Sequence, residues 1–224
     1  MYLGRCCGRG SFMAASRVVI WLHGLGDSGP ANQGIASFFT SPEFADFKWR
    51  FPSAPNQPVS CNGRMRMPSW FDLPEIPIVP ESPNVEEDVL KAVRSVHEMI
   101  DREVAAGISA DCIFLCGFSQ GGALALASSM LYPKTLAGAA VFSGWVALDK
   151  ESFAAKITSA AKQTPVLWQH GLDDKVVEFS AGQAGPPFLA RADVKCEFQA
   201  IPDLVHSIDA EELSTLKRWM KERL

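Results

Sequence analysis

The feature that most constrains this chain is a serine flanked by glycines between an apolar run and a segment of small residues. The apolar run, residues 112–116, ends at Gly117, and Gly117–Gly121 has the pattern Gly-x-Ser-x-Gly around Ser119. Strand, sharp turn and helix in this order form a nucleophile elbow, in which the glycines leave room for a strained backbone. The pattern therefore predicts that Ser119 is a nucleophile rather than an ordinary loop serine.

Composition excludes several classes of function. The 224 residues fit one domain with a sizeable core. A formal net charge of −4, with no basic stripe, argues against a nucleic-acid partner. No apolar run approaches the roughly 18 residues of a transmembrane segment. Residues 1–16 contain no apolar core of a secretory signal, so we expect a flexible tail there.

The six cysteines favour a reducing compartment. They show no Cys-x-x-Cys metal spacing, and Cys112 and Cys116 lie on one face of an expected buried strand. Reduced, packed thiols indicate a cytoplasmic protein that is also able to reach the nucleus. The pair Cys6 and Cys7 is open to two interpretations. A disordered leader is the simpler one, and S-acylation with weak membrane association is the alternative.

Strands and helices alternate along the chain. Apolar runs predict buried strands at residues 17–22 and 112–116, and further strands are expected at residues 48–51, 136–143, 165–170 and 194–199. Helical patterns occupy residues 32–39, 84–106, 120–132 and 153–162, and a last helix opens at residue 209. Capping boxes are expected at Asn84 with Glu87 and at Asp209 with Glu212. The alternation predicts an α/β fold, a mostly parallel central sheet with helices on both faces, over residues 17–224 as a single domain.

A proline-rich stretch interrupts this alternation. Eight prolines between residues 52 and 83 argue for an irregular excursion over the surface. Its part from about residue 73 to 83 is too apolar for a solvated loop, which predicts a lid over the serine. The alternative is packing against the nearest helix. The expected acyl channel consists of Met65, Met67, Trp70, Leu73, Ile76, Ile78 and Val79.

A nucleophilic serine needs a base and an acid that orients the base. Among the four histidines, only His206 follows every candidate acid and lies in a loop beyond the last expected strand. The acid is Asp173 or Asp174, in the loop after the strand at 165–170, with Asp149 as a weaker third choice. An oxyanion hole would take N–H groups from Gln120 and, in the glycine turn 23–26, from Leu25.

Several segments together resemble one known family. The matching segments are residues 22–27, 51–55, 67–72, 117–122, 170–174 and 205–207. In this order they resemble the acyl-protein thioesterases and carboxylesterases of the α/β-hydrolase fold, especially the plant branch. The resemblance implies a triad of Ser119, Asp174 and His206, oxyanion donors Leu25 and Gln120, and no metal or cofactor.

The resemblance also implies the reaction. Family members cleave S-acyl groups from protein cysteines and acyl groups from small carboxylic esters, and deacetylation has been proposed for the plant branch. Alternatives are a lysophospholipid or acetylated-protein substrate, or a silent hydrolase fold that only binds a ligand. The chain departs from the family pattern at Leu172, where an aspartate is usual. It also departs at Gly182, Gly185, Pro186 and Pro187, which interrupt a helix.

Overall fold

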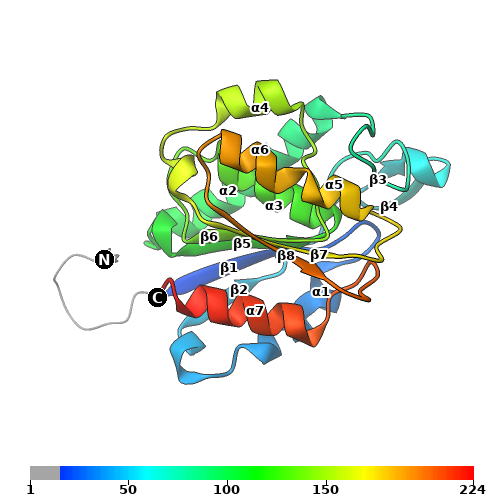
Figure 1. Ribbon diagram of the computed structural model, residues 1–224. Helices are drawn as coiled ribbons and strands as arrows, with labels where there is room; N and C mark the ends of the chain where they lie inside the picture. The colour runs from blue at the N-terminus through cyan, green and yellow to red at the C-terminus, as the bar shows by residue number, and fades with distance from the viewer. Residues whose placement is uncertain (1–15) are drawn as a thin grey trace.

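A computed structural model describes residues 16–224, and its centre is a six-stranded sheet (Figure 1). The strand order is β2-β1-β5-β6-β7-β8, and every neighbouring pair is parallel. The strands are β1 (Arg17–Leu22), β2 (Phe47–Arg50), β5 (Ile113–Phe118), β6 (Gly138–Phe142), β7 (Val166–Gly171) and β8 (Cys196–Ile201). This confirms the parallel sheet that the alternation of strands and helices predicts.

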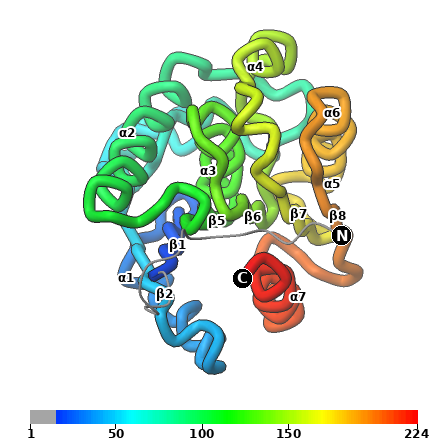
Figure 2. The backbone as a smooth tube through the Cα atoms, turned by 90° about the vertical axis from the view of Figure 1, so that its left-hand side faces the viewer, coloured from blue at the N-terminus to red at the C-terminus, as the bar shows by residue number. Residues whose placement is uncertain are grey.

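Helices cover both faces of the sheet, as Figures 1 and 2 show. The α-helices are α1 (Gly29–Asn32), α2 (Glu86–Ala105), α3 (Gln120–Leu131), α4 (Lys150–Lys156), α5 (Phe179–Gln183), α6 (Gly185–Arg191) and α7 (Ala210–Lys221). Short 3₁₀ helices lie at Gln33–Phe38, Pro42–Phe44, Ser60–Asn62, Ala110–Cys112 and Ala161–Gln163. Helices α2 to α6 lie on one face of the sheet, and α7 lies on the other (Figure 2).

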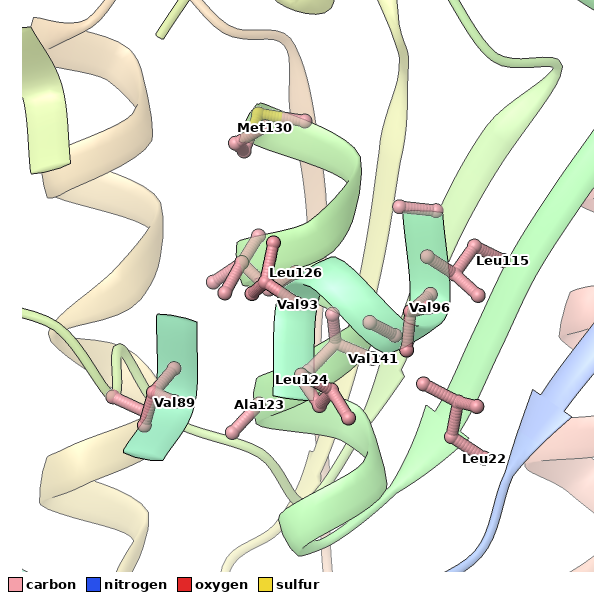
Figure 3. Close-up of a cluster of buried hydrophobic side chains, with 14 of the residues drawn as sticks. Leu22, Val89, Val93, Val96, Leu115, Ala123, Leu124, Leu126, Met130 and Val141 are labelled. Atoms are coloured by element: carbon pink, nitrogen blue, oxygen red, sulfur yellow. The ribbon is translucent and has the colours of Figure 1, made fainter. Parts of the chain in front are cut away.

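Two apolar cores follow from this layering. Alternate residues of β1 point to opposite faces, so Val18 and Ile20 join one core while Val19 and Trp21 join the other. In the larger core, α2 packs its apolar stripe against α3 and the strands, and Figure 3 labels its central residues. The helix α3 is buried on all sides, which explains its small residues. It is therefore held rigidly beneath the turn that carries Ser119.

Local details differ from the sequence predictions. The proline-rich stretch contains an antiparallel hairpin of β3 (Asn56–Val59) and β4 (Met65–Pro68), although it was expected to be irregular. Prolines are tolerated there because each strand of a two-stranded sheet has a free edge. The predicted cap at Asn84 is wrong: Val85 takes the N-cap position and makes no side-chain bond. Three acidic residues in the first turn of α2 interact favourably with the helix dipole instead.

The capping box at the start of α7 is confirmed. The Asp209 carboxylate accepts the Glu212 N–H at 2.8 Å, and the Glu212 carboxylate accepts the Asp209 N–H at 3.2 Å. The helix expected at 153–162 is shorter and starts earlier, as α4, and the chain closes that region with a 3₁₀ turn. The helix expected at 32–39 is mostly 3₁₀. The interruption expected around residues 182–187 is confined to Ala184, which separates α5 from α6.

The strand order creates a crevice for a ligand. The chain runs from β1 outward to β2, and it then returns to the other side of β1 to form β5. Ligands of open parallel sheets bind at such a reversal, beyond the carboxyl ends of the strands. The loop after β1 and the turn after β5 meet there, and these segments carry the glycine turn and Ser119.

Three sequence predictions concern the N-terminal cysteines, membrane-spanning segments and metal sites. The pair Cys6 and Cys7 lies outside the described residues. Within residues 16–224, no helix is both long and apolar enough to cross a lipid bilayer. The same residues contain no cluster of three or more histidine, cysteine or acidic side chains able to hold a metal ion.

Candidate active site

Ser119 occupies a strained turn between β5 and α3. Its backbone angles are φ 55° and ψ −121°, a conformation that L-residues rarely adopt. The turn lies tightly against β1: a Cβ added at Gly121 would overlap the carbonyl of Leu22, and one added at Gly117 would overlap Gly121 itself. These two positions therefore require glycine. The strain is offset by the packing of α3, and Ser119 keeps 7 % of its surface exposed.

His206 connects Ser119 to Asp174. The Ser119 hydroxyl lies 2.9 Å from His206 Nε2, and His206 Nδ1 lies 2.7 Å from Asp174 Oδ2. A carboxylate only accepts, so Nδ1 carries the proton and Nε2 is free to accept the serine proton. The ring of Phe118 lies beside that of His206, with centroids 4.7 Å apart. The sequence motifs thus meet in one hydrogen-bonded chain of serine, histidine and aspartate.

Asp174 is built to remain ionised. Burial acts to raise the pKa of the carboxyl, but hydrogen bonds from His206 and from the N–H groups of Val176 and Val177 outweigh it and lower the pKa. The residue as a whole is 2 % exposed. Asp173 is exposed, and its backbone N–H donates to Leu204 instead. Between the two aspartates that the sequence leaves open, only Asp174 contacts the histidine.

The other three described histidines do not reach Ser119 with a hydrogen bond. His23 lies buried at the end of β1, His97 bonds the Ser128 carbonyl on α3, and His170 bonds the Val177 carbonyl. Asp149, the third acid choice, caps α4 through the Ser152 N–H. It therefore has a local structural role.

The glycine turn after β1 is held by His23. Its Nδ1–H donates to the Gly24 carbonyl at 2.7 Å, while its Nε2 accepts the Ala54 N–H at 3.0 Å. The Gly24 carbonyl and the Leu25 N–H belong to one planar trans peptide, so they point in opposite directions. Since His23 and the Asp27 N–H hold the carbonyl, the Leu25 N–H is turned away from them. Leu25 also lines the cavity above Ser119.

The backbone and the side chain of Gln120 have separate roles in this site. As the first residue of α3, its backbone N–H has no acceptor within the helix. Its buried side chain accepts the Trp70 N–H at 3.0 Å and donates to the Phe71 carbonyl at 2.7 Å. These bonds tie the segment after β4 to the nucleophile turn. The backbone N–H of Gln120 is thereby placed at the helix N-terminus, beside Ser119.

A cavity of about 270 Å³ opens above Ser119 and His206. Its walls are mainly apolar, and Asp27 supplies the one carboxylate among the described residues that line it. The remaining lining residues are Gly24, Leu25, Leu73, Ile76, Ile78, Phe118, Trp145, Val176 and Val177. An apolar cavity with a few converging polar groups is the usual form of a small-molecule site.

The predicted acyl channel is partly different. Leu73, Ile76 and Ile78 line the cavity as expected. The other four predicted residues do not: Met65, Met67, Trp70 and Val79 lie outside it. Met65 projects from the β3–β4 hairpin with 66 % of its surface exposed. The hairpin, which the sequence does not reveal, holds Met65 at the surface, and Met67 packs against the core beside Gly26 of the glycine turn.

Trp70 and Val79 have structural roles in place of the predicted one. Trp70 donates its indole N–H to the His23 carbonyl at 2.8 Å, which supports the glycine turn from behind. The Val79 N–H donates to the Ser82 hydroxyl at 3.0 Å within its own loop. Sequence reasoning also missed the lining residues Trp145, Val176 and Val177. Their one signal is position, because each follows the carboxyl end of a parallel strand.

Comparison with known proteins agrees with this geometry. Residues 12–224 match the family described as Phospholipase/Carboxylesterase. A probable carboxylesterase of Oryza sativa is 60 % identical over 206 residues, covering 92 % of this chain and 77 % of the relative. An acyl-protein thioesterase 1 of Cryptococcus neoformans is 37 % identical over 228 residues, covering 94 % of each chain.

A solved structure gives the same result. The crystal structure of the carboxylesterase SOBER1 of Arabidopsis thaliana superposes with a TM-score of 0.90 at 53 % identity. The match covers 92 % of this chain and 98 % of that structure. The chain therefore belongs to the phospholipase/carboxylesterase family, with the α/β-hydrolase fold.

Proposed function

We propose that this protein is a serine hydrolase that cleaves ester and thioester acyl groups through a triad of Ser119, His206 and Asp174. The observation that carries the proposal is the continuous hydrogen-bonded chain from the Ser119 hydroxyl through His206 to Asp174. This chain lies under an apolar cavity at the carboxyl ends of the strands. The names of the similar proteins support the same reaction class.

The reaction proceeds in two halves. Ser119 Oγ attacks the acyl carbonyl while His206 Nε2 takes the hydroxyl proton, and the Leu25 and Gln120 N–H groups bind the oxyanion. His206 then gives the proton to the leaving alcohol or thiol as the bond to the acyl carbon breaks. Water, deprotonated by His206, attacks the acyl-enzyme in the same way, and Ser119 recovers its proton. Asp174 stabilises the imidazolium in both halves.

The substrate is an uncharged acyl group on an alcohol or on a cysteine thiol. The cavity walls are apolar, and its one fixed charge is the Asp27 carboxylate, which disfavours an anionic acyl group. An acylated protein cysteine and a small carboxylic ester both fit this chemistry. Lysophospholipids and acetylated proteins are the other substrates that the same triad serves.

Turnover of a homologous substrate series tests this proposal. We expect the wild-type protein to hydrolyse p-nitrophenyl esters from acetate to palmitate and matched acyl thioesters, with a definite chain-length optimum. Ser119→Ala should abolish turnover of every member. Equal turnover of the series by the wild type and by Ser119→Ala would refute the proposal.

We also propose a cytoplasmic location. Cys116 is a buried free thiol, and burial raises its pKa, so it stays protonated and inert. Free thiols in the core are typical of reducing compartments. Differential alkylation of the protein isolated from cells tests this: Cys116 should be recovered reduced, and a disulfide at this cysteine would contradict the location.

A further inference from the structure

A second histidine lies next to Asp174. His170 is fully buried near the end of β7, four residues before the aspartate. Its Nε2 lies 2.8 Å from the Val177 carbonyl oxygen and 3.5 Å from Asp174 Oδ2. The steps of ester cleavage derived above do not use this ring.

The hydrogen bond defines the state of the His170 ring. A carbonyl oxygen only accepts, so Nε2 carries the proton. Nδ1 is buried and has no hydrogen-bond partner among the described residues. Burial lowers the pKa of His170, and the bond to Val177 and the charge of Asp174 offset this only in part. His170 is therefore a neutral ring with a single N–H directed at Val177 and Asp174.

The packing around His170 leaves the ring one position. A Cβ added at Gly182 would overlap His170 Nδ1, so the ring occupies the space that the side chain of any other residue at position 182 would take. Phe179, also on α5, meets the ring edge-on with centroids 6.0 Å apart. The glycine that departs from the family pattern thus makes room for this histidine.

The hydrogen bond to Val177 helps to support the loop that carries Asp174, residues 172–178 between β7 and α5, here called the acid loop. Asp174 Oδ1 accepts the N–H groups of Val176 and Val177, each at 2.9 Å. The His170 N–H holds the carbonyl of the same Val177. Val177 also pairs with Ile78 from the proline-rich stretch. The loop that sets the Asp174 rotamer is therefore anchored to β7 by one neutral histidine.

We propose that His170 is a positioning residue for the triad. Its Nε2–H donates to the Val177 carbonyl, the Val177 N–H donates to Asp174, and Asp174 orients His206. The inference rests on the proposed function, since it assumes that His206 is the base. Loss of the N–H leaves the fold intact but loosens the carboxylate, so the His206 imidazolium is stabilised less.

Three substitutions separate this role from simple packing. His170→Gln keeps an N–H donor that reaches the Val177 carbonyl, whereas His170→Leu fills similar space without a donor. Gly182→Ala displaces the ring and removes no polar group. For each variant the measurements are kcat, KM, the pH dependence of kcat/KM, the melting temperature, and the rate at which a fluorophosphonate labels Ser119.

The expected pattern is specific. His170→Leu and Gly182→Ala should lower kcat by about tenfold to a hundredfold, the usual effect of losing a hydrogen bond to a charged network, with KM changed less than about threefold. The acid limb of kcat/KM should move to lower pH by about half a unit or more, because a less stabilised imidazolium needs more acid to form. His170→Gln should keep most of the wild-type kcat, and its acid limb of kcat/KM should lie at the wild-type pH.

Three results would overturn the inference. The first is a folded His170→Leu with wild-type kcat and an unmoved acid limb. The second is a His170→Gln as impaired as His170→Leu. The third applies if His170→Leu does not fold. In that case the inference is overturned by a Gly182→Ala protein that has a reduced melting temperature but an unchanged kcat and an unchanged acid limb of kcat/KM. Failure of the proposed function looks different, because the wild type itself would then not be labelled at Ser119.

Discussion

Adjacent aspartates after β7 have opposite environments, and this contrast decides their roles. Asp174 is buried and receives three hydrogen bonds, one of them from His206. Asp173 faces solvent one residue earlier. The chain itself thus provides a matched pair of carboxylates, one inside the proposed triad and one outside it.

This pair leads to a prediction for the two isosteric amides. Asp174→Asn should lower kcat by on the order of 10⁴-fold, because the amide favours the wrong tautomer of His206. Asp173→Asn should stay within about threefold of the wild type, since only its backbone N–H is bonded. Steady-state kinetics on one p-nitrophenyl ester measures both. A larger loss at Asp173 would reverse the assignment.

At the scale of elements, the acid loop holds the proline-rich segment over the cavity. The Ile78 N–H donates to the Val176 carbonyl at 2.8 Å, and the Glu178 N–H donates to the Ile78 carbonyl at 2.9 Å. Ile78 is consequently 3 % exposed, whereas Ile76 is 43 % exposed and lines the cavity. Val79, in the same segment, does not line it.

These placements predict how residues 73–83 influence substrate choice. Ile76→Ser removes apolar surface from the cavity and should shift the chain-length optimum, because each buried methylene is worth about 0.8 kcal/mol. Val79→Ser changes the same segment outside the cavity and should leave the profile unaltered. Rates across the series from acetate to palmitate measure the effect. Identical profiles for Ile76→Ser and the wild type would exclude a role of this segment in selecting the acyl chain.

The elements also show what the sequence could predict. Strands β1 and β5 are largely continuous apolar runs buried on both faces, so pattern alone locates them. The β3–β4 hairpin contains Pro58 and Pro68, which argue against a strand, and only its free edges make them tolerable. Missing the hairpin misplaced Met65 and Met67. Trp145 and Val177 reach the cavity through loop geometry that no periodicity encodes.

At the scale of the whole molecule, one buried carboxyl makes stability depend on pH. Burial raises the pKa of Glu212 to about 8, from an ordinary value of 4.5. The folded state therefore binds this proton more tightly than the unfolded state, so the stability is largest below about 4.5 and falls as pH rises toward 8. Asp174 acts in the opposite direction, since its lowered pKa removes stability as pH falls.

The substitution Glu212→Gln removes the contribution of Glu212 ionisation to the pH dependence of stability. The amide oxygen still accepts the Asp209 N–H, but the side chain cannot ionise. Relative to the wild type, the variant should gain on the order of 10 °C in melting temperature between pH 5 and pH 8.5, because the wild type loses roughly 4 kcal/mol over this range and about 1 kcal/mol shifts a domain of this size by 2–4 °C. Glu211→Gln is the control, because Glu211 is exposed on the same helix turn. A parallel pH dependence of the wild type and Glu212→Gln would contradict the account.

Covalent labelling of Ser119 tests the central claim most directly. The wild-type protein, treated with a fluorophosphonate near neutral pH, should gain the mass of one adduct, and the modified peptide should contain Ser119. Ser119→Ala should gain no mass, and His206→Ala and Asp174→Asn should react far more slowly. An adduct that persists in Ser119→Ala, or that forms at another residue in the wild type, would contradict the triad.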